Sequence, residues 1–325
     1  MTLLHQRFPE LDLPHVVLRP GPSPVRRVPG LPGEVWVKDD GPVGTVYGGN
    51  KVRKLEWALA DARARGCTWV LTAGALATNH GLATALYARE LGLRTAVVLI
   101  DQPLDDYTAR GYERLRASGA SLYLAHTPRR AYALAPWVFL RHTGRRPPYF
   151  LTVGGSSLHG MAGFVEAGLE LGEQVAQGEL PEPAAVVLPV GSGGCAAGLL
   201  LGLRLAGLRT RVHGVLVNDA TPVDARSVLR MAERTRRFLV RHGGSLAAPD
   251  PDDLVLDTRW LGPGYGHPTA EAAAAAAVLA GEGVVTEPVY TAKAAAGLLD
   301  LAARTDGPVL HWQTHNTIPL ELPVA

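Results

Sequence analysis

The sequence predicts an α/β protein with two domains, in which parallel-rich sheets are covered by helices. Three observations predict this class. The chain has 325 residues, which is more than one hydrophobic core usually holds. Short apolar segments alternate along it with segments whose apolar residues recur at helical spacing. The composition, 47% hydrophobic and 19% charged, is that of a globular protein.

The elements are expected in two series. Residues 1–33 are rich in proline and glycine and are expected to wrap the surface before a strand at 35–38. The first series then has strands at 69–72, 95–100 and 121–124 and helices at 52–65, 81–91 and 107–118. The second has strands at 184–188 and 212–217, a helix from Ala196 and a helix over 223–242.

The last third of the chain adds a long loop and an alanine-rich helix. Residues 243–268 are rich in glycine and proline, and loops of that length inside a compact chain are often functional. Thr269 is a candidate N-cap for the following helix, with Glu271 in its first turn. Pro147-Pro148 and Gly154-Gly155 indicate a domain edge.

Charge and cysteine content exclude several classes of protein. A net charge of +2 is too balanced to indicate a nucleic-acid or membrane partner. Two cysteines, Cys67 and Cys195, make no disulfide framework, and no CxxC spacing indicates a metal site. The N-terminus lacks the apolar core of a signal peptide, and the longest uncharged apolar stretch, 272–280, is about half of what a membrane span needs. We therefore expect a soluble cytoplasmic protein without a metal.

The segment GGNKVRK at 48–54 places two lysines at the start of a helix. Its two glycines allow a sharp turn, and Lys51 and Lys54 are three residues apart, so they share a face of the first turn. Two ammonium groups near the positive end of a helix repel each other, which would lower the pKa of a lysine and prepare its amine to form a Schiff base. Taken alone, the segment fits ordinary surface lysines as well.

A glycine-rich loop joins the strand at 184–188 to the helix from Ala196. Its residues, Gly191-Ser192-Gly193-Gly194, would offer converging backbone N–H groups to a phosphate. The loop also resembles a dinucleotide fingerprint, but the first acidic residue after it, Asp219, comes too late for one. A tight strand–helix turn without a ligand is the alternative.

Two further segments carry polar or aromatic candidates. Thr78, Asn79 and His80 follow the strand at 69–72, where Asn79 would donate to a phenolate-type oxygen and the others would hold a carboxylate; a plain N-cap is the alternative. Tyr290, in TEPVYT, would stack on a flat ring, with Tyr265 in a glycine-flanked segment upstream. Core packing is the alternative for Tyr290.

Six motifs in this order resemble the D-cysteine desulfhydrase / 1-aminocyclopropane-1-carboxylate (ACC) deaminase family of fold-type-II, tryptophan-synthase-β-like pyridoxal-phosphate (PLP) enzymes. They are GGNKVRKLE, AGALATNHGLATA, GGSSLHGMAGF, PVGSGGCAAGL, GPGYGHP and EPVYTAKAAAGL. The resemblance covers residues 37–310. It implies a two-domain fold, with a smaller domain of residues 48–161 inserted into a larger PLP-binding domain of residues 1–47 and 162–325. It also implies a homodimer.

The resemblance assigns roles residue by residue. Lys51 matches the Schiff-base lysine, and Asn79 the residue that hydrogen-bonds the cofactor's phenolic oxygen. Tyr290 matches the tyrosine against the pyridine ring, and Tyr265 a second tyrosine on the opposite side. The implied cofactor site comprises Lys51, Lys54, Asn79, Gly191, Ser192, Gly193, Gly194, Cys195, Tyr290, Thr291 and Thr314. The implied substrate site comprises Thr78, Asn79, His80, Tyr265, His315 and Asn316.

Thr291 bears on the expected reaction. It stands where desulfhydrase-like members place a neutral hydroxyl facing the pyridine nitrogen and ACC deaminases a glutamate. A neutral pyridine stabilises a carbanion less, which favours β-elimination of a good leaving group over opening a cyclopropane ring. We therefore expect a lyase that forms pyruvate and ammonia, with Lys51 and Thr78 handling the Cα proton and Tyr290 and Tyr265 as further catalytic residues.

Three departures from the family pattern bear on the substrate. Thr78 stands where serine is usual, and Cys195 replaces a threonine after the phosphate-binding glycines. His315 and Asn316 follow Thr314 where two glycines are usual. The alternatives that stay open are an ACC deaminase, elimination from another β-substituted amino acid such as cysteate, and a racemase. Outside PLP chemistry they are a nucleotide-dependent oxidoreductase and an inactive ligand-binding relative.

Overall fold

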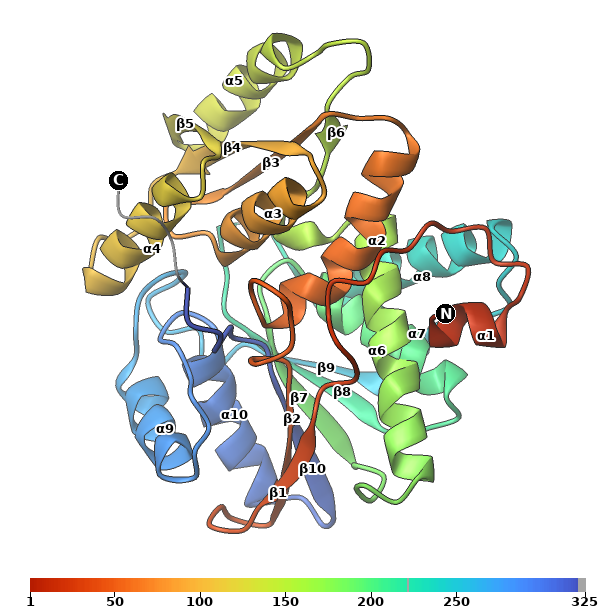
Figure 1. The fold of residues 1–325 in the computed structure, drawn as a ribbon. Coiled ribbons are helices and arrows are strands. Elements are labelled where there is room, and N and C mark those ends of the chain that lie inside the picture. The colour runs from red at the N-terminus through yellow and green to blue at the C-terminus, as the bar shows by residue number, and fades with distance from the viewer. Residues whose placement is uncertain (221, 321–325) are drawn as a thin grey trace.

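The structure, a computed structural model, describes residues 1–220 and 222–320 and contains two sheets. The larger sheet has six strands in the order β1-β2-β10-β7-β8-β9, and the smaller has four in the order β5-β4-β3-β6 (Figure 1). The strands of the larger sheet are β1 (Val25–Val28), β2 (Glu34–Asp39), β7 (Ala185–Val190), β8 (Arg211–Leu216), β9 (Leu254–Asp257) and β10 (Pro308–Gln313). Those of the smaller sheet are β3 (Trp69–Ala75), β4 (Arg94–Ile100), β5 (Ser121–His126) and β6 (Tyr149–Phe150).

Parallel pairing dominates both sheets. The β1–β2 pair is antiparallel, and the other pairs described are parallel. Parallel strands need crossover connections, and here the crossovers are helices that cover the sheets. The predicted class, an α/β fold with parallel-rich sheets flanked by helices, is confirmed.

The helices bury different parts of the chain. They are α1 (Leu3–Arg7), α2 (Asn50–Ala64), α3 (Asn79–Glu90), α4 (Asp106–Ala117), α5 (Pro128–Arg141), α6 (Leu158–Ala176), α7 (Gly194–Leu205), α8 (Ala225–Arg241), α9 (Ala270–Gly281) and α10 (Thr291–Ala302). Helix α2 joins two cores: Trp57 packs with residues of α6 and α7, whereas Leu55 and Leu59 pack with residues of the smaller sheet and α3. The helix that carries Lys51 is therefore fixed from two sides.

Several elements differ from those expected. The glycine- and proline-rich stretch 243–268 contains β9, which pairs with β8, and residues 1–33 contain α1 and β1. Helices α5 and α6 were not predicted; α5 carries Pro136 inside it and α6 is rich in glycine. The predicted cap at Thr269 is present, because its side chain accepts the N–H of Ala272. Within the described residues, no helix has both the length and the apolar character to cross a membrane.

Candidate active site

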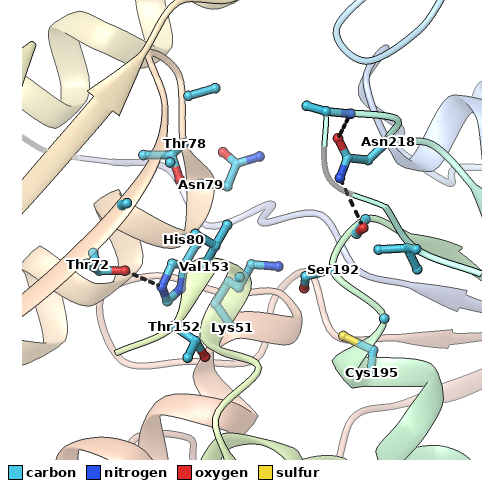
Figure 2. Close-up of a pocket in the computed structure, with 18 of the residues that line it drawn as sticks. Lys51, Thr72, Thr78, Asn79, His80, Thr152, Val153, Ser192, Cys195 and Asn218 are labelled. Atoms are coloured by element: carbon cyan, nitrogen blue, oxygen red, sulfur yellow. Dashed lines mark hydrogen bonds between the residues drawn. The ribbon is translucent and has the colours of Figure 1, made fainter. Parts of the chain in front are cut away.

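A cavity of about 990 Å³ opens where the two sheets face each other. It is lined by the start of α2, the turn between β3 and α3, the β7–α7 loop, and residues just before α10 and after β10. Figure 2 shows Thr78, Asn79 and His80 on one side, Ser192 and Cys195 on the other, and Lys51 between them. The carboxyl ends of parallel strands are the usual place for ligands in such folds.

The start of α2 is held by the backbone around it. Gly49 has φ of 83°, a conformation open to glycine, and its N–H donates to the Asp40 carbonyl at 2.7 Å. The Asn50 N–H donates to the Thr314 carbonyl at 3.2 Å, which ties α2 to the end of β10. These bonds fix the position from which the Lys51 side chain enters the cavity.

Lys51 has the features of an amine prepared for covalent chemistry. Its Nζ donates to Asn50 Oδ1 at 2.9 Å. The pKa of Lys51 is lowered to about 8, first by burial and then by the nearby Lys54 ammonium, whereas Cys195 and Glu287 act in the opposite direction. Repulsion between the two lysines was expected to lower this pKa, but burial contributes more.

Lys54 and the β7–α7 loop form an anion cradle. Gly193 has φ of 82° and precedes the first turn of α7, so backbone N–H groups of the loop converge at the positive end of the helix. Lys54 Nζ donates to the Gly154 carbonyl at 2.9 Å and the Ser156 hydroxyl at 3.3 Å. A Cβ on Gly194 would stand 3.2 Å from Lys54 Nζ, so glycine leaves the space between them open. This cradle fits a phosphate.

Asn79 is oriented by two tyrosines. Its Oδ1 accepts a hydrogen bond from the Tyr47 hydroxyl at 3.1 Å, and its Nδ2 donates to the Tyr107 hydroxyl at 3.2 Å. An amide nitrogen carries two hydrogens, so one N–H remains for a ligand. Burial raises the pKa of Tyr47 and of Tyr107, so both phenols are protonated at neutral pH.

Thr78 and His80 each lie within hydrogen-bond distance of a nearby residue. The Thr78 hydroxyl accepts the Gly81 N–H at 3.2 Å, so Thr78 caps α3 while lining the cavity. His80 Nε2 lies 3.0 Å from the Thr72 hydroxyl (Figure 2). Its Nδ1 is buried without a hydrogen-bond partner among the described residues. Burial and the nearby lysine ammonium groups hold the pKa of His80 well below its usual value, so its imidazole is neutral.

Tyr265 and Tyr290 lie together in the cavity lining. Their hydroxyls are 2.9 Å apart and their rings meet edge to face, with centroids 5.9 Å apart. The expected placement of the two tyrosines on opposite sides of the pyridine ring stays a prediction. The Glu287 carboxylate accepts the N–H groups of Val289, Tyr290 and Thr291 and so fixes the entry to α10.

His315 and Asn316 have different surroundings. Asn316 Oδ1 accepts the N–H of Gly48 at 2.6 Å and of Ile318 at 3.1 Å, and its Nδ2 donates to the Ile318 carbonyl. Asn316 therefore fixes the loop beside Lys51. His315 lines the same cavity, but its Nδ1 is buried without a partner among the described residues.

Most of the predicted site residues come together in this cavity. The lining includes Lys51, Lys54, Thr78, Asn79, His80, Gly191, Ser192, Gly193, Cys195, Tyr265, Tyr290, Thr314, His315 and Asn316. Gly194 lies just behind the lining. Thr291 is fully buried outside it, and its hydroxyl accepts the Glu287 N–H at 2.8 Å. The position of Thr291 against a ring nitrogen stays a prediction.

Three functional candidates were missed in the sequence. Tyr47 directly precedes the glycine turn at 48–49, and Glu287 begins the motif that contains Tyr290, so both stand beside a recognised signal. Tyr107 has no such signal, because α4 brings it to Asn79 from 28 residues away. The side chains of Tyr47 and Glu287 line the cavity.

A buried amine of lowered pKa, a phosphate cradle beside it and a wall of aromatic and amide groups are together the parts that a PLP site requires. The fold and the site thus define a PLP-dependent enzyme. The chain belongs to the family whose model is described as "Pyridoxal-phosphate dependent enzyme", which matches residues 16–311. Its cofactor is pyridoxal phosphate, and the predicted broad class, a PLP-dependent lyase or deaminase, is confirmed.

Known relatives span nearly the whole chain. A protein named D-cysteine desulfhydrase from Salmonella choleraesuis (strain SC-B67) is 34% identical over 97% of this chain and 96% of its own length. A D-cysteine desulfhydrase from Serratia proteamaculans (strain 568) is also 34% identical, over 95% and 94%. Among solved structures, an ACC deaminase homologue has a TM-score of 0.79 at 29% identity and covers 94% of this chain and 92% of its own.

Proposed function

We propose that the protein catalyses β-elimination from a small β-substituted amino acid, with D-cysteine as the first candidate. Elimination from cysteine consumes water and yields hydrogen sulfide, pyruvate and ammonia. The observation that carries the proposal is Lys51, whose amine stands in the cavity beside the phosphate cradle with a pKa lowered to about 8. The 34% identity to the D-cysteine desulfhydrase of Salmonella over 97% of the chain supports the choice of substrate.

Each part of the site has a task in this reaction. Bound through Lys51 and the cradle, PLP supplies an electron sink for the electron pair left at Cα. The Lys51 amine would accept the Cα proton, and Thr78 lines the same cavity and would hold the substrate. The remaining N–H of Asn79 would donate to the cofactor ring.

The tyrosine pair is suited to the leaving group. Burial raises the pKa of Tyr265 and of Tyr290, so both hydroxyls keep their protons at neutral pH. The two hydroxyls are hydrogen-bonded to each other. When one of them donates its proton to the leaving group, the other can donate a hydrogen bond to it. We assign them the delivery of a proton to the departing sulfur.

ACC deamination is the second candidate, because the solved ACC deaminase homologue has a TM-score of 0.79 with this chain. Thr291, whose hydroxyl accepts the Glu287 N–H, stays the residue that favours elimination over ring opening. Cysteate and other β-substituted amino acids remain in the substrate panel. A racemase would be recognised because it inverts the configuration of the amino acid without forming pyruvate.

The test is a panel of D- and L-cysteine, serine, cysteate and ACC with the holoenzyme. Pyruvate or 2-oxobutyrate, sulfide and inversion of each amino acid are measured, and Lys51→Ala is the control. We expect sulfide and pyruvate from cysteine, and a loss of several orders of magnitude in Lys51→Ala. Turnover of ACC alone would replace the first candidate by the second, and no turnover of any member would reject both.

We also propose that the enzyme is a cytoplasmic homodimer with the two domains predicted from the sequence. The segregation of β3–β6 within residues 69–150 into their own sheet supports the domain division. The resemblance on which the homodimer was predicted supports the dimer. Light scattering of the purified holoenzyme measures its mass, and a monomer would contradict this part of the proposal.

A further inference from the structure

The cavity continues outward beyond the groups that serve the cofactor. It runs between α5 and α8, where Ala131 and Tyr132 of α5, with Phe150 and Val153, form one wall and Arg230 and Arg234 of α8 line the other. A volume of about 990 Å³ is at the upper end of the range for small-molecule sites. The space therefore exceeds what PLP and a three-carbon amino acid need.

The α8 wall presents two positive charges. Arg230 and Arg234 are four residues apart, so they share a face of the helix. Within the described part of the chain, neither guanidinium has a carboxylate within 4.0 Å. Glu233 of the same helix is engaged by Arg236 and Arg237 instead.

The arginines stand next to the phosphate cradle. Met231, between them in sequence, has its Cε 2.5 Å from where a Cβ on Gly193 would lie. Lys54 and the N-terminus of α7 would already hold the cofactor's phosphate, so these two arginines are additional cations. Glu287 is the one carboxylate among the described lining residues, and it is engaged by backbone N–H groups at the start of α10.

The α5 wall is apolar and open. The side chains of Tyr132, Phe150 and Val153 are 79%, 54% and 48% exposed. Large exposed apolar groups gathered at a cavity mouth are typical of a ligand-binding surface. An apolar wall facing two cations favours a ligand that is flat or aliphatic along one side and ends in an anion.

We propose that the cleft between α5 and α8 is a subsite for the β-substituent of the substrate, and that the preferred substituents are extended thioethers with an apolar body and a terminal anionic group. The inference rests on the proposed β-elimination and names its substrate class. The reaction needs no reagent besides water. The Cα proton and the Cβ–S electron pair leave, the sulfur departs as a thiol, and water converts the remainder to pyruvate and ammonia.

Two matched compounds test the subsite on the holoenzyme. S-(4-carboxyphenyl)cysteine carries the anion, and S-(4-carbamoylphenyl)cysteine has the same shape without charge. Both enantiomers of each are assayed for thiol and pyruvate release, and their Kd values are measured by calorimetry. We expect the carboxylate to be favoured by about tenfold in kcat/KM and in Kd, with a preference that shrinks as salt rises from 0.05 to 0.5 M.

The double variant Arg230→Gln/Arg234→Gln should bring this ratio close to one. Arg226→Gln removes one positive charge from α8 at a position outside the cavity lining and should keep the ratio. Equal kcat/KM and Kd for the two compounds in the wild type would overturn the subsite. A double variant that only slows the uptake of PLP by the apoenzyme, with the ratio retained, would also overturn it and assign the arginines to the cofactor.

The proposed function and the subsite fail in distinguishable ways. Turnover of cysteine by the wild type tests the elimination without using the cleft. If no compound is turned over, the ratio of Kd values still decides whether the arginines select an anion. If cysteine is turned over but the two Kd values agree, the elimination stands and the subsite is rejected.

Discussion

Asn79 shows how two tyrosines orient a side chain that we propose as a donor to the cofactor. Tyr47 comes from the loop before α2 and Tyr107 from α4, and together they bind both ends of the amide. Without them, the amide would be free to rotate and exchange its oxygen and nitrogen. The orientation that leaves an N–H for the cofactor thus depends on residues outside the recognised motifs.

We predict that Tyr107→Phe weakens cofactor binding. It removes the acceptor of the Asn79 N–H, a bond worth about 1 kcal/mol, so the Kd of PLP should rise by about fivefold. Titration of the apoenzyme followed by the absorbance of the bound cofactor measures this. Tyr112→Phe, on the same helix but lining a separate small cavity, is the control. Equal Kd values for the two variants would contradict the role of Tyr107.

The lowered pKa of Lys51 predicts how the rate of cofactor attachment depends on pH. With a pKa of about 8, its amine is mostly charged at pH 7 and mostly free at pH 9. The rate at which the apoenzyme forms a borohydride-reducible bond to PLP should therefore rise through about pH 8 and level off above it. Stopped-flow absorbance gives the profile. A midpoint near the ordinary lysine value of 10.5 would show that burial does not act on this amine in solution.

His315 and Asn316 are predicted to differ in their effects. His315→Gly should change the ranking of substrates, because the His315 side chain lines the cavity. Asn316→Gly should instead lower stability by about 1–2 kcal/mol, because it removes the acceptor of the Gly48 N–H. kcat/KM across the amino-acid panel and urea unfolding separate the two. The same substrate ranking in His315→Gly and wild type would return His315 to a structural role.

At the scale of elements, the sequence was informative where short apolar runs alternate with segments of helical apolar spacing. Strands β3, β4, β7 and β8 and the helices that follow them were predicted from these two patterns, and the β7–α7 junction is also marked by glycines. Strand β9 is four residues long inside a glycine- and proline-rich stretch, which hides it. Helix α6 was missed because its glycines resemble those of a loop.

The glycines of α6 have a packing role. A Cβ on Gly163 would overlap the backbone carbonyl of Arg53, so α6 approaches α2 more closely than alanine permits. A Cβ on Gly168 would stand 2.5 Å from the carbonyl carbon of Gly202 in α7. The close contact with α2 matters for the site, because the same helix holds Lys51 and Lys54.

We predict that Gly163→Ala destabilises the protein by about 2 kcal/mol or more, since the backbone of α2 must move to admit the methyl group. The shift should also reduce the affinity for PLP. Gly281→Ala is the control, because no atom lies within 4 Å of its Cβ position at the end of α9. That change should be neutral or stabilising by helix propensity. Similar urea midpoints for both variants would refute the close approach.

At the scale of the whole molecule, buried ion pairs connect the segments around the site. Arg53 of α2 pairs with Asp40 at the end of β2 and with Glu170 of α6, each at 2.8 Å. Lys38 of β2 reaches the same Glu170 at 2.6 Å. These partners lie far apart in the sequence. The motifs therefore indicated the candidate cofactor site, but no residue spacing could predict the ion-pair network that supports it. The same is true of Tyr107.

His311 provides the last prediction, which concerns acid stability. It lies in β10 between Val37 and Val187, both ring nitrogens lack a partner among the described residues, and burial lowers its pKa to about 4. As the pH falls, His311 takes up a proton near pH 6.5 in the unfolded chain but only near pH 4 in the folded protein. His311 therefore costs no stability above about pH 6.5, and the free energy of unfolding falls as the pH drops from 6.5 through 4. The loss should reach about 3 kcal/mol at pH 4. His311→Leu removes this titration, whereas the carboxylates and other histidines are unchanged. The free energy of unfolding is measured in urea from pH 7 to pH 4 for the variant and the wild type. The variant value minus the wild-type value should grow by that amount as the pH falls. A difference independent of pH would show that His311 is charged or solvated in the folded protein.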